Sequence, residues 1–483
     1  MSAHIPSDIH PKRIPAAKLL SRSSQLLPGQ LLVTEYFFEV PLDYADASVG
    51  TIQLFGRSVT KHEVPIIPIP ESELYHVSQK PWFVYLEGGP GFGNREPQES
   101  PLTRFVLGRG YQLLFLDYRG TGLSTPITAD GLELKGSPSK QADYLKLFRQ
   151  DTNVRDLEAV REYLTDGYPP EKRQWSIFGQ SFGGFVALSY LSFRPEGLRE
   201  VFMTGGLAPV GKTAEEVYRA TYRKVIERNK AYYNKYPQDV SLVRHLARYI
   251  YNSKEEITMP AGGRLSVRRL LTLGHMFGMH GGLDTIHSTL LRMKADLDQV
   301  GFFTRPTLSQ IEQFLPFDIA PIYAILHEAI YCYAPGVASK WAAHRVGQEI
   351  HEFSWLSDEP PSGADGEDLF HQVLYFSGEM IYPFMFDTYP ELRRMKEAAE
   401  LLAAYERWPA LYDEARLAAN EVPVYAASFA EDMFVDFGLA RETASKVANT
   451  KVFETNALYH NAVRARTDEV LLQLFRLRDD CID

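Results

Sequence analysis

Cysteine is scarce in this chain, with only Cys332 and Cys481 among 483 residues. Two cysteines so far apart in sequence cannot build a disulfide framework, and they argue against a metal site made of thiolates. We interpret both as free thiols in a reducing compartment. The sequence therefore favours a cytoplasmic protein.

Long apolar runs and an excess of basic residues are also absent. No run of about 18 apolar residues occurs, so we expect no membrane-spanning helix. Residues 1–24 lack the apolar segment of a signal peptide, and their three prolines oppose the amphipathic helix of a transit peptide. The formal net charge of −10 argues against a nucleic-acid surface. We therefore expect neither a membrane nor a nucleic acid as a partner.

Apolar strands alternate with helical segments in the first part of the chain. The spacing of apolar residues predicts a helix over residues 156–164. Continuous apolar runs that end in glycine turns are typical of buried parallel strands, whereas the first two predicted strands read as an antiparallel pair. The six predicted strands are residues 31–40, 51–59, 81–86, 111–116, 174–179 and 200–206. This alternation predicts an α/β protein with a mostly parallel central sheet.

The strand pattern is interrupted by a long segment that is mostly helical in composition. Strand patterns return at residues 422–429 and 451–457, and a helix over residues 468–477 follows them. We therefore predict one α/β core in two pieces, residues 1–208 and 421–483. A helical cap domain, residues 209–420, is inserted after the sixth strand, and its length is that of a domain.

A G-x-S-x-G motif, Gly179 to Gly183, carries the first chemical signal. It follows an apolar strand and opens a helix, which is the context of the nucleophile elbow in the α/β-hydrolase fold. A serine on such a tight turn has a strained backbone, and side chains two residues away would collide with neighbouring segments. We predict Ser181 as a nucleophile rather than an idle serine in a structural turn.

A serine hydroxyl needs a base, and the base needs a carboxylate to orient it. In this fold the partners follow the serine in the order acid, then histidine. Of the histidines after Ser181, only His460 lies beyond the point where the strand pattern returns, so we predict it as the base. For the acid we choose Asp432, just past the strand at residues 422–429. Asp436 and Glu431 remain alternatives.

Two backbone N–H groups should stabilise the negative charge that develops on the substrate oxygen. One is expected from Phe182, which follows the nucleophile. The other is expected from the glycine run after the strand at residues 81–86, at Gly88 and Gly89. The run D-x-R-G-x-G-x-S at residues 117–124 is expected to shape the neighbouring loop.

Taken together, these motifs resemble the proline iminopeptidase (prolyl aminopeptidase) family of serine peptidases. The resemblance rests on Gly-Gly-Pro-Gly at residues 88–91, on residues 117–124 and on Gly-Gln-Ser-Phe-Gly-Gly at residues 179–184. In the insertion, residues 326–331 and 378–383 resemble the long-chain branch found in fungi and actinobacteria. One departure is a glutamate at position 87, where the family usually has histidine.

The resemblance implies an α/β-hydrolase that removes N-terminal proline from peptides by acyl transfer. It implies no metal and no organic cofactor, and it implies that the insertion covers the active site. An aminopeptidase must bind a protonated N-terminus, so we predict Glu379 and Glu328 in the insertion as its carboxylate partners. The alternative for each glutamate is a salt bridge to an arginine such as Arg345.

Two other classes of function compete with this prediction: a different hydrolase on the same fold and a non-enzymatic binding protein. An esterase or another N-terminal peptidase would use the same fold and residues, because fold and triad do not fix the substrate. An epoxide hydrolase of this fold would have aspartate at the position of Ser181. A binding protein on a degenerate hydrolase scaffold is disfavoured by the intact set of serine, histidine, acid and glycine run.

Overall fold

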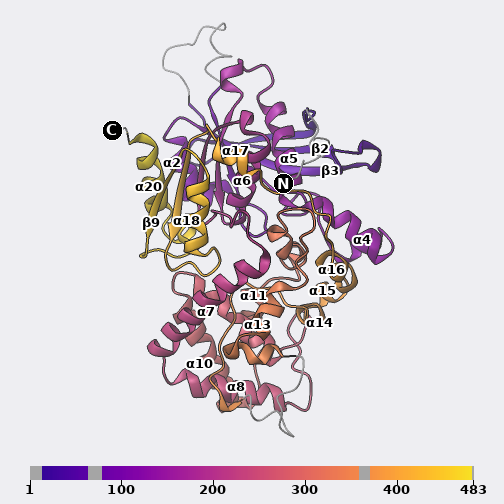
Figure 1. Cartoon of the computed structure of the whole chain (residues 1–483), viewed down its shortest axis with the longest axis vertical. Coiled ribbons are helices and arrows are strands. Elements are labelled where there is room, and N and C mark those ends of the chain that lie inside the picture. Colours follow the sequence, from indigo (N-terminus) through magenta and orange to yellow (C-terminus); the bar gives the residue numbers. More distant parts are fainter. Residues whose placement is uncertain (1–12, 64–78, 358–369, 481–483) are drawn as a thin grey trace.

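A nine-stranded sheet forms the centre of the upper lobe in Figure 1, and helices make up the lower lobe. The computed structural model describes residues 13–63, 79–357 and 370–480. Most of the N-terminal segment considered above and Cys481 lie outside these residues. Cys332 is a buried free thiol. Among the described residues, no helix is both long and apolar enough to cross a membrane.

The sheet is mixed but mostly parallel, as the sequence predicts. Its strand order is β1-β2-β3-β5-β4-β6-β7-β8-β9. β1, β2, β3 and β5 pair antiparallel in succession, and all later pairs are parallel. The strands are β1 (Lys18–Leu27), β2 (Leu31–Pro41), β3 (Thr51–Lys61), β4 (Trp82–Leu86), β5 (Gln112–Leu116), β6 (Trp175–Gln180), β7 (Leu198–Thr204), β8 (Val424–Phe429) and β9 (Thr450–Thr455).

Strand β1 is absent from the sequence prediction. Nearly all its side chains are exposed, and it pairs only with β2 at the edge of the sheet. An edge strand with two solvated faces carries no alternation of apolar and polar residues, which is the signal that identifies strands. Because of this extra strand, the helical insertion follows the seventh strand in the chain and not the sixth.

Helices cover both faces of the sheet, which explains why the central strands are apolar throughout. On β4, Val84 and Leu86 face the cluster that includes α5 and α6, while Phe83 and Tyr85 face α2 and α20. The helices of this part are α2 (Pro101–Leu107), α3 (Ala129–Glu133), α4 (Pro138–Leu145), α5 (Gln150–Leu164), α6 (Phe182–Phe193), α18 (Phe437–Lys446), α19 (Ala462–Ala465) and α20 (Thr467–Asp479).

The segment between β7 and β8 is helical, and most of it forms the lower lobe (Figure 1). Its first helix begins with a capping box, in which the Thr213 hydroxyl and the Glu216 carboxylate bond each other's backbone N–H. Its helices are α7 (Ala214–Lys235), α8 (Asp239–Asn252), α9 (Val267–Leu271), α10 (Gly282–Val300), α11 (Arg305–Phe314), α12 (Pro321–Ile325), α13 (Ala342–Gln348), α14 (Met385–Thr388), α15 (Pro390–Arg393), α16 (Lys396–Ala403) and α17 (Glu414–Ala418).

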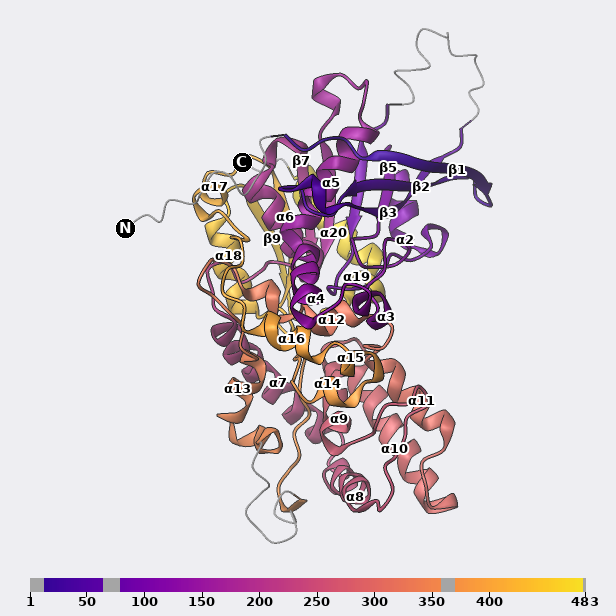
Figure 2. The same ribbon diagram turned by 90° about the vertical axis from the view of Figure 1, so that its right-hand side faces the viewer.

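The end of the insertion packs against the hydrolase part before the chain re-enters the sheet. Helix α16 contacts α4, and α17 contacts α6 (Figure 2). Arg394 forms ion pairs with Asp130 and Glu133 of α3. The helical segment is therefore joined to the sheet-bearing part by a contact surface as well as by its two connections.

Candidate active site

Ser181 lies on the sharp turn between β6 and α6. Its backbone has φ 53° and ψ −120°, a conformation that residues with a side chain rarely adopt. The turn is possible because glycines surround it: a Cβ on Gly183 would lie 2.1 Å from the Leu86 carbonyl oxygen. A Cβ on Gly179 would lie 2.4 Å from the Gly183 carbonyl carbon. The motif thus has one glycine where β4 and α6 pass close to each other and one where β6 and α6 do.

Ser181, His460 and Asp432 come together at the carboxyl end of the sheet. His460 Nε2 lies 2.9 Å from Ser181 Oγ, and His460 Nδ1 lies 2.8 Å from Asp432 Oδ2. The other Asp432 oxygen, Oδ1, accepts hydrogen bonds from the Phe434 and Val435 N–H groups. With Nδ1 donating to the aspartate, Nε2 is free to accept the serine proton. This is the geometry that a serine nucleophile requires.

The surroundings of His460 act on its pKa in opposite directions. Burial lowers the pKa, whereas the charge of Asp432, the hydrogen bond to Asp432 and the charge of Glu379 raise it. The net effect raises the pKa above its usual value. The Asp432 carboxylate therefore stabilises the imidazolium that would form when His460 takes a proton.

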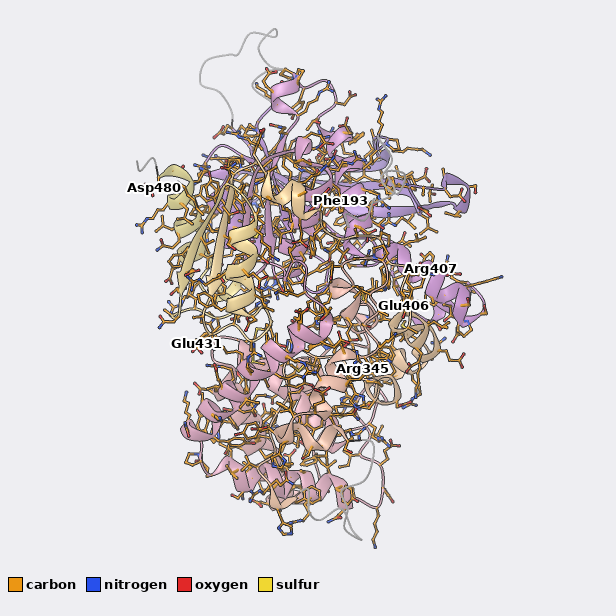
Figure 3. All side chains as sticks on the ribbon, in the orientation of Figure 1. Phe193, Arg345, Glu406, Arg407, Glu431 and Asp480 are labelled. Carbon is orange, nitrogen blue, oxygen red and sulfur yellow. The ribbon has the colours of Figure 1, made fainter. Side chains whose placement is uncertain are left out.

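The two alternative acids occupy other positions. Asp436 is the N-cap of α18, where its side chain accepts a hydrogen bond from the Leu439 N–H at 2.9 Å. Glu431 is partly exposed, near the boundary of the two lobes in Figure 3. Only Asp432, which is 1% exposed, contacts the His460 ring among these three acids.

The predicted oxyanion donors differ in what their N–H groups contact. The Gly88 N–H donates to Glu87 Oε1 at 2.8 Å, so the structure does not leave it free for a substrate. Gly89 lines the pocket beside Ser181. Phe182 is the first residue of α6, where a backbone N–H has no acceptor within the helix. The structure thus gives the Gly88 N–H an acceptor within the protein, and Gly89 and Phe182 stay predicted donors.

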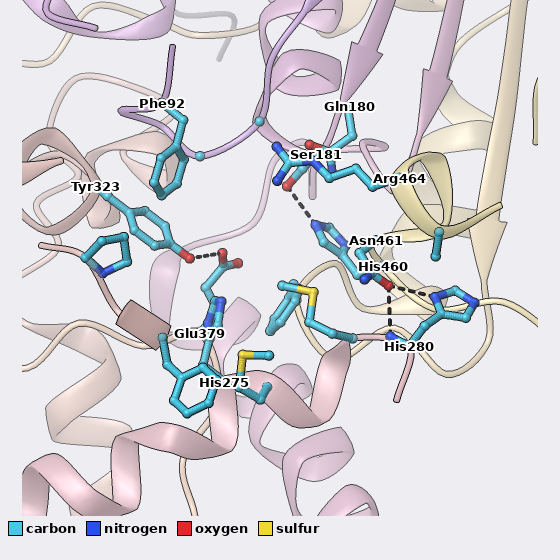
Figure 4. Close-up of a pocket in the computed structure, with 18 of the residues that line it drawn as sticks. Phe92, Gln180, Ser181, His275, His280, Tyr323, Glu379, His460, Asn461 and Arg464 are labelled. Atoms are coloured by element: carbon cyan, nitrogen blue, oxygen red, sulfur yellow. Dashed lines mark hydrogen bonds between the residues drawn. The ribbon is translucent and has the colours of Figure 1, made fainter. Parts of the chain in front are cut away.

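A cavity of about 460 Å³ opens in front of Ser181 and His460 (Figure 4). Both lobes contribute to it. Its walls are Gly88, Gly89, Phe92, Arg95, Gln180, Ser181, His275, Met276, Met279, His280, Phe314, Pro316, Tyr323, Glu379, Phe434, His460, Asn461, Arg464 and Ala465. In the part of the chain that the structure describes, no group of three or more His, Cys, Asp or Glu side chains is placed to hold a metal ion.

Glu379 is the carboxylate among the residues that line this cavity. Its Oε1 accepts a hydrogen bond from the Tyr323 hydroxyl at 2.6 Å, and Figure 4 shows the pair facing the Ser181 side of the cavity. Burial lowers the pKa of the neighbouring His275 to about 4, although the charge of Glu379 opposes this. Burial likewise lowers the pKa of His327. Both shifts favour the neutral imidazole in the two rings beside Glu379.

Glu328 does not line the cavity, contrary to the prediction from sequence. Its two oxygens accept hydrogen bonds from the Ala342 and Ala343 N–H groups at the start of α13. Burial raises its pKa to about 7, and these hydrogen bonds oppose the shift. The alternative of a pair with Arg345 is not observed either, because that arginine, labelled in Figure 3, pairs with Glu215. Glu328 is therefore a buried side chain that caps the N-terminus of α13.

Several residues of the cavity are missed by the sequence prediction. Arg464 stands four residues after His460, on the short helix α19. Its guanidinium bonds the buried Glu87 carboxylate at 2.7 Å, which accounts for the glutamate at position 87. His280 and Tyr323 come from the insertion, and the His280 ring bonds Asn461 beside His460. Their sequence surroundings carry no spacing that marks them.

Known proteins resemble this chain over its whole length. A family model for the α/β hydrolase fold matches residues 81–260. Proline iminopeptidase aneH of Aspergillus aculeatus is 40% identical, covering 98% of this chain and 99% of its own. A proline iminopeptidase of Aeromonas sobria is also 40% identical, covering 92% and 96% respectively. A solved proline iminopeptidase of Mycobacterium smegmatis aligns over 95% of this chain and 98% of its own, with 12% identity and a TM-score of 0.41.

The two 40% identities extend across the strands that carry Ser181, Asp432 and His460 and also across the helical insertion. A match confined to the hydrolase core would indicate only the fold, since that core hosts many activities. A match that includes the insertion, which supplies eight of the nineteen residues that line the cavity, is more specific. The chain belongs to the proline iminopeptidase family, on an α/β-hydrolase fold.

Proposed function

We propose that the protein is a serine aminopeptidase that releases N-terminal proline from peptides. The observation that carries this proposal is the chain of hydrogen bonds Ser181–His460–Asp432 in a cavity that also contains Glu379. The hydrogen-bonded set supplies acyl-transfer chemistry, and the carboxylate supplies a partner for a cationic N-terminus. The family membership supports proline as the residue released.

In the proposed reaction, Ser181 Oγ attacks the carbonyl carbon of the N-terminal residue while His460 Nε2 takes the serine proton. The Phe182 and Gly89 N–H groups stabilise the oxyanion. His460 then gives the proton to the departing peptide nitrogen, and the C–N bond breaks to leave a prolyl ester on Ser181. A water molecule, deprotonated by His460, attacks this ester, and the serine leaves with the proton restored.

Recognition of the free N-terminus is assigned to Glu379. Its carboxylate lies in a cavity lined largely by apolar and aromatic side chains, where a charged hydrogen bond is stronger than in water. The proposed cap domain, residues 209–420, contributes Glu379 together with His275 and Tyr323. The partners that this arrangement suits are peptides with a free N-terminal proline.

The test compares two substrates on one variant. Glu379→Gln should lower kcat/KM for proline p-nitroanilide by roughly 10- to 150-fold, the value of a charged hydrogen bond of about 1.5–3 kcal/mol. Hydrolysis of p-nitrophenyl acetate should change much less, because that ester uses Ser181 but offers no cation. Glu406→Gln is the matched control, since Glu406 is an exposed glutamate of the same insertion, paired with Lys340.

The same two substrates separate the competing functions. An esterase would hydrolyse p-nitrophenyl acetate efficiently and leave proline p-nitroanilide almost untouched in the wild type. Equal losses on both substrates in Glu379→Gln would mean that Glu379 supports the site structurally and does not bind the substrate's amine.

A further inference from the structure

Two arginines line the cavity in addition to the residues used above. Arg464 lies on α19, directly after the loop that holds His460, and Arg95 lies in the loop after β4. In Figure 4, Arg464 extends along the Ser181 and Gln180 side of the cavity, whereas Glu379 and Tyr323 lie on the other side. The cavity therefore has an acidic side and a basic side.

Arg464 has donors to spare for a ligand. One of its nitrogens donates to Glu87 Oε1, and this carboxylate is the main cause that raises the pKa of Arg464 and keeps it charged. A guanidinium has five N–H groups in a planar fork, and this side chain is 40% exposed on the cavity wall. Its partner Glu87 is buried, which fixes the position of the guanidinium beside the glycine loop.

Arg95 adds a second positive charge near Arg464, since the two side chains line both this cavity and a smaller one beside Glu87. Its side chain is exposed, and within the described residues the structure records no ion pair for it. Since Glu87 neutralises one of the two arginines, this side of the cavity keeps a net positive charge. Two neighbouring arginines attract a carboxylate, because the two oxygens of a carboxylate can accept two parallel hydrogen bonds from one guanidinium.

The order of groups along a substrate shows which part would reach these arginines. With the N-terminal nitrogen at Glu379 and the first carbonyl carbon at Ser181, the departing peptide continues away from Glu379. His460 must also face the departing nitrogen to protonate it, and Arg464 follows His460 by four residues, on the short helix α19. The basic side thus adjoins the leaving part of the peptide.

We propose that Arg464 and Arg95 bind the C-terminal carboxylate of short peptides, so that dipeptides with N-terminal proline are preferred substrates. This inference rests on the proposed function. A dipeptide carries a positive and a negative charge at its two ends, and the cavity presents the opposite charge at each side. In a longer peptide the carboxylate is carried beyond the arginines, and the preference is lost.

The decisive comparison uses the wild-type enzyme with Pro-Ala, its C-terminal amide Pro-Ala-NH2 and the tetrapeptide Pro-Ala-Ala-Ala. We expect kcat/KM for Pro-Ala to exceed that for the amide by roughly tenfold or more, the value of one charged hydrogen bond. The tetrapeptide should behave like the amide. These substrates differ only beyond the bond that is cleaved, so the chemistry at Ser181 is held constant.

Variants then assign the effect to the two arginines. Arg95→Gln and Arg464→Lys should each lower the ratio of kcat/KM for Pro-Ala to kcat/KM for Pro-Ala-NH2 toward one. Lysine is chosen at position 464 because it retains a positive charge beside Glu87. Arg104→Gln is the matched control, because Arg104 is exposed on α2 and absent from the cavity wall, and the ratio should stay at the wild-type value.

A wild-type enzyme that cleaves Pro-Ala and Pro-Ala-NH2 equally well would overturn this inference and leave the proposed function intact. Failure to cleave either peptide or proline p-nitroanilide would instead overturn the proposed function, and the inference with it. If the ratio of kcat/KM for Pro-Ala to that for Pro-Ala-NH2 stayed at the wild-type value in both arginine variants, the carboxylate would bind elsewhere.

Discussion

The residues of the site differ in how far the sequence determines them. Ser181, Asp432 and His460 were predictable because the fold fixes their chain order and places each after a strand. Glu379 and Glu328 were indistinguishable in sequence, since both stand among apolar residues. Only the tertiary structure separates them: one faces the cavity, and the other binds the N–H groups at the start of α13.

The acid can be tested by comparing two aspartates. Asp432→Asn should lower kcat by roughly 10³- to 10⁴-fold, because the His460 ring loses both its orientation and the stabilisation of its charged form. Asp436→Asn should have little effect on kcat, since asparagine is also a good N-cap for α18. Steady-state rates on proline p-nitroanilide check both, and the reverse ranking would make Asp436 the acid.

The raised pKa of His460 predicts the pH dependence of the reaction. The base must be neutral to accept a proton, so kcat/KM should rise with pH and reach half its maximum above the usual histidine value of 6.5. The charge of Glu379 contributes to raising this pKa. Glu379→Gln should therefore move the acidic limb to lower pH, measured with a neutral ester so that substrate recognition does not contribute.

In this pH profile, Glu406→Gln serves as the control and should leave the limb in place. A limb that does not move in Glu379→Gln would show that Glu379 has no electrostatic influence on His460.

At the scale of elements, the buried strands were predictable and the exposed edge strand β1 was not. Continuous apolar runs marked β4 to β7, because these strands pack helices on both faces. Strand β1 carries no such signal, since its side chains are solvated and its backbone bonds only β2. The nucleophile elbow was predictable because an apolar strand precedes its glycines and a helix follows them.

The close approach of β4 and α6 can be tested at one glycine. Gly183→Ala should lower the Tm and the activity together, because its Cβ would lie 2.1 Å from the Leu86 carbonyl oxygen and the backbone must shift. Overpacking of this kind costs about 1–3 kcal/mol or more. Calorimetry of the purified variant measures the change.

Gly438→Ala is the matched control for this variant. Gly438 is exposed on α18, and the nearest atom to an added Cβ is Asp436 Oδ1 at 3.2 Å. Its Tm should stay the same or rise slightly, since alanine is the better helix former. A Gly183→Ala protein as stable and active as the wild type would contradict the packing described for the elbow.

At the scale of the whole molecule, the site exists only because distant segments meet. The sheet supplies Ser181 and His460, and the helical insertion supplies Glu379 and Tyr323. We proposed domain boundaries from the strand and helix patterns of the sequence, at residues 1–208, 209–420 and 421–483. These patterns carry no information on how the parts contact one another. Helices α3 and α4 precede the insertion in the chain and yet pack against its final helices. Such long-range contacts leave no local signal in the sequence.

The central claim is that this whole assembly works through one serine. The most direct measurement is the rate of proline release by Ser181→Ala, together with labelling of the wild type by a serine-directed phosphonate. We predict a fall in kcat of roughly 10³-fold or more, an unchanged Tm within the error of calorimetry, and a label on Ser181 that the variant lacks. Near-normal turnover by a folded Ser181→Ala protein would contradict the account.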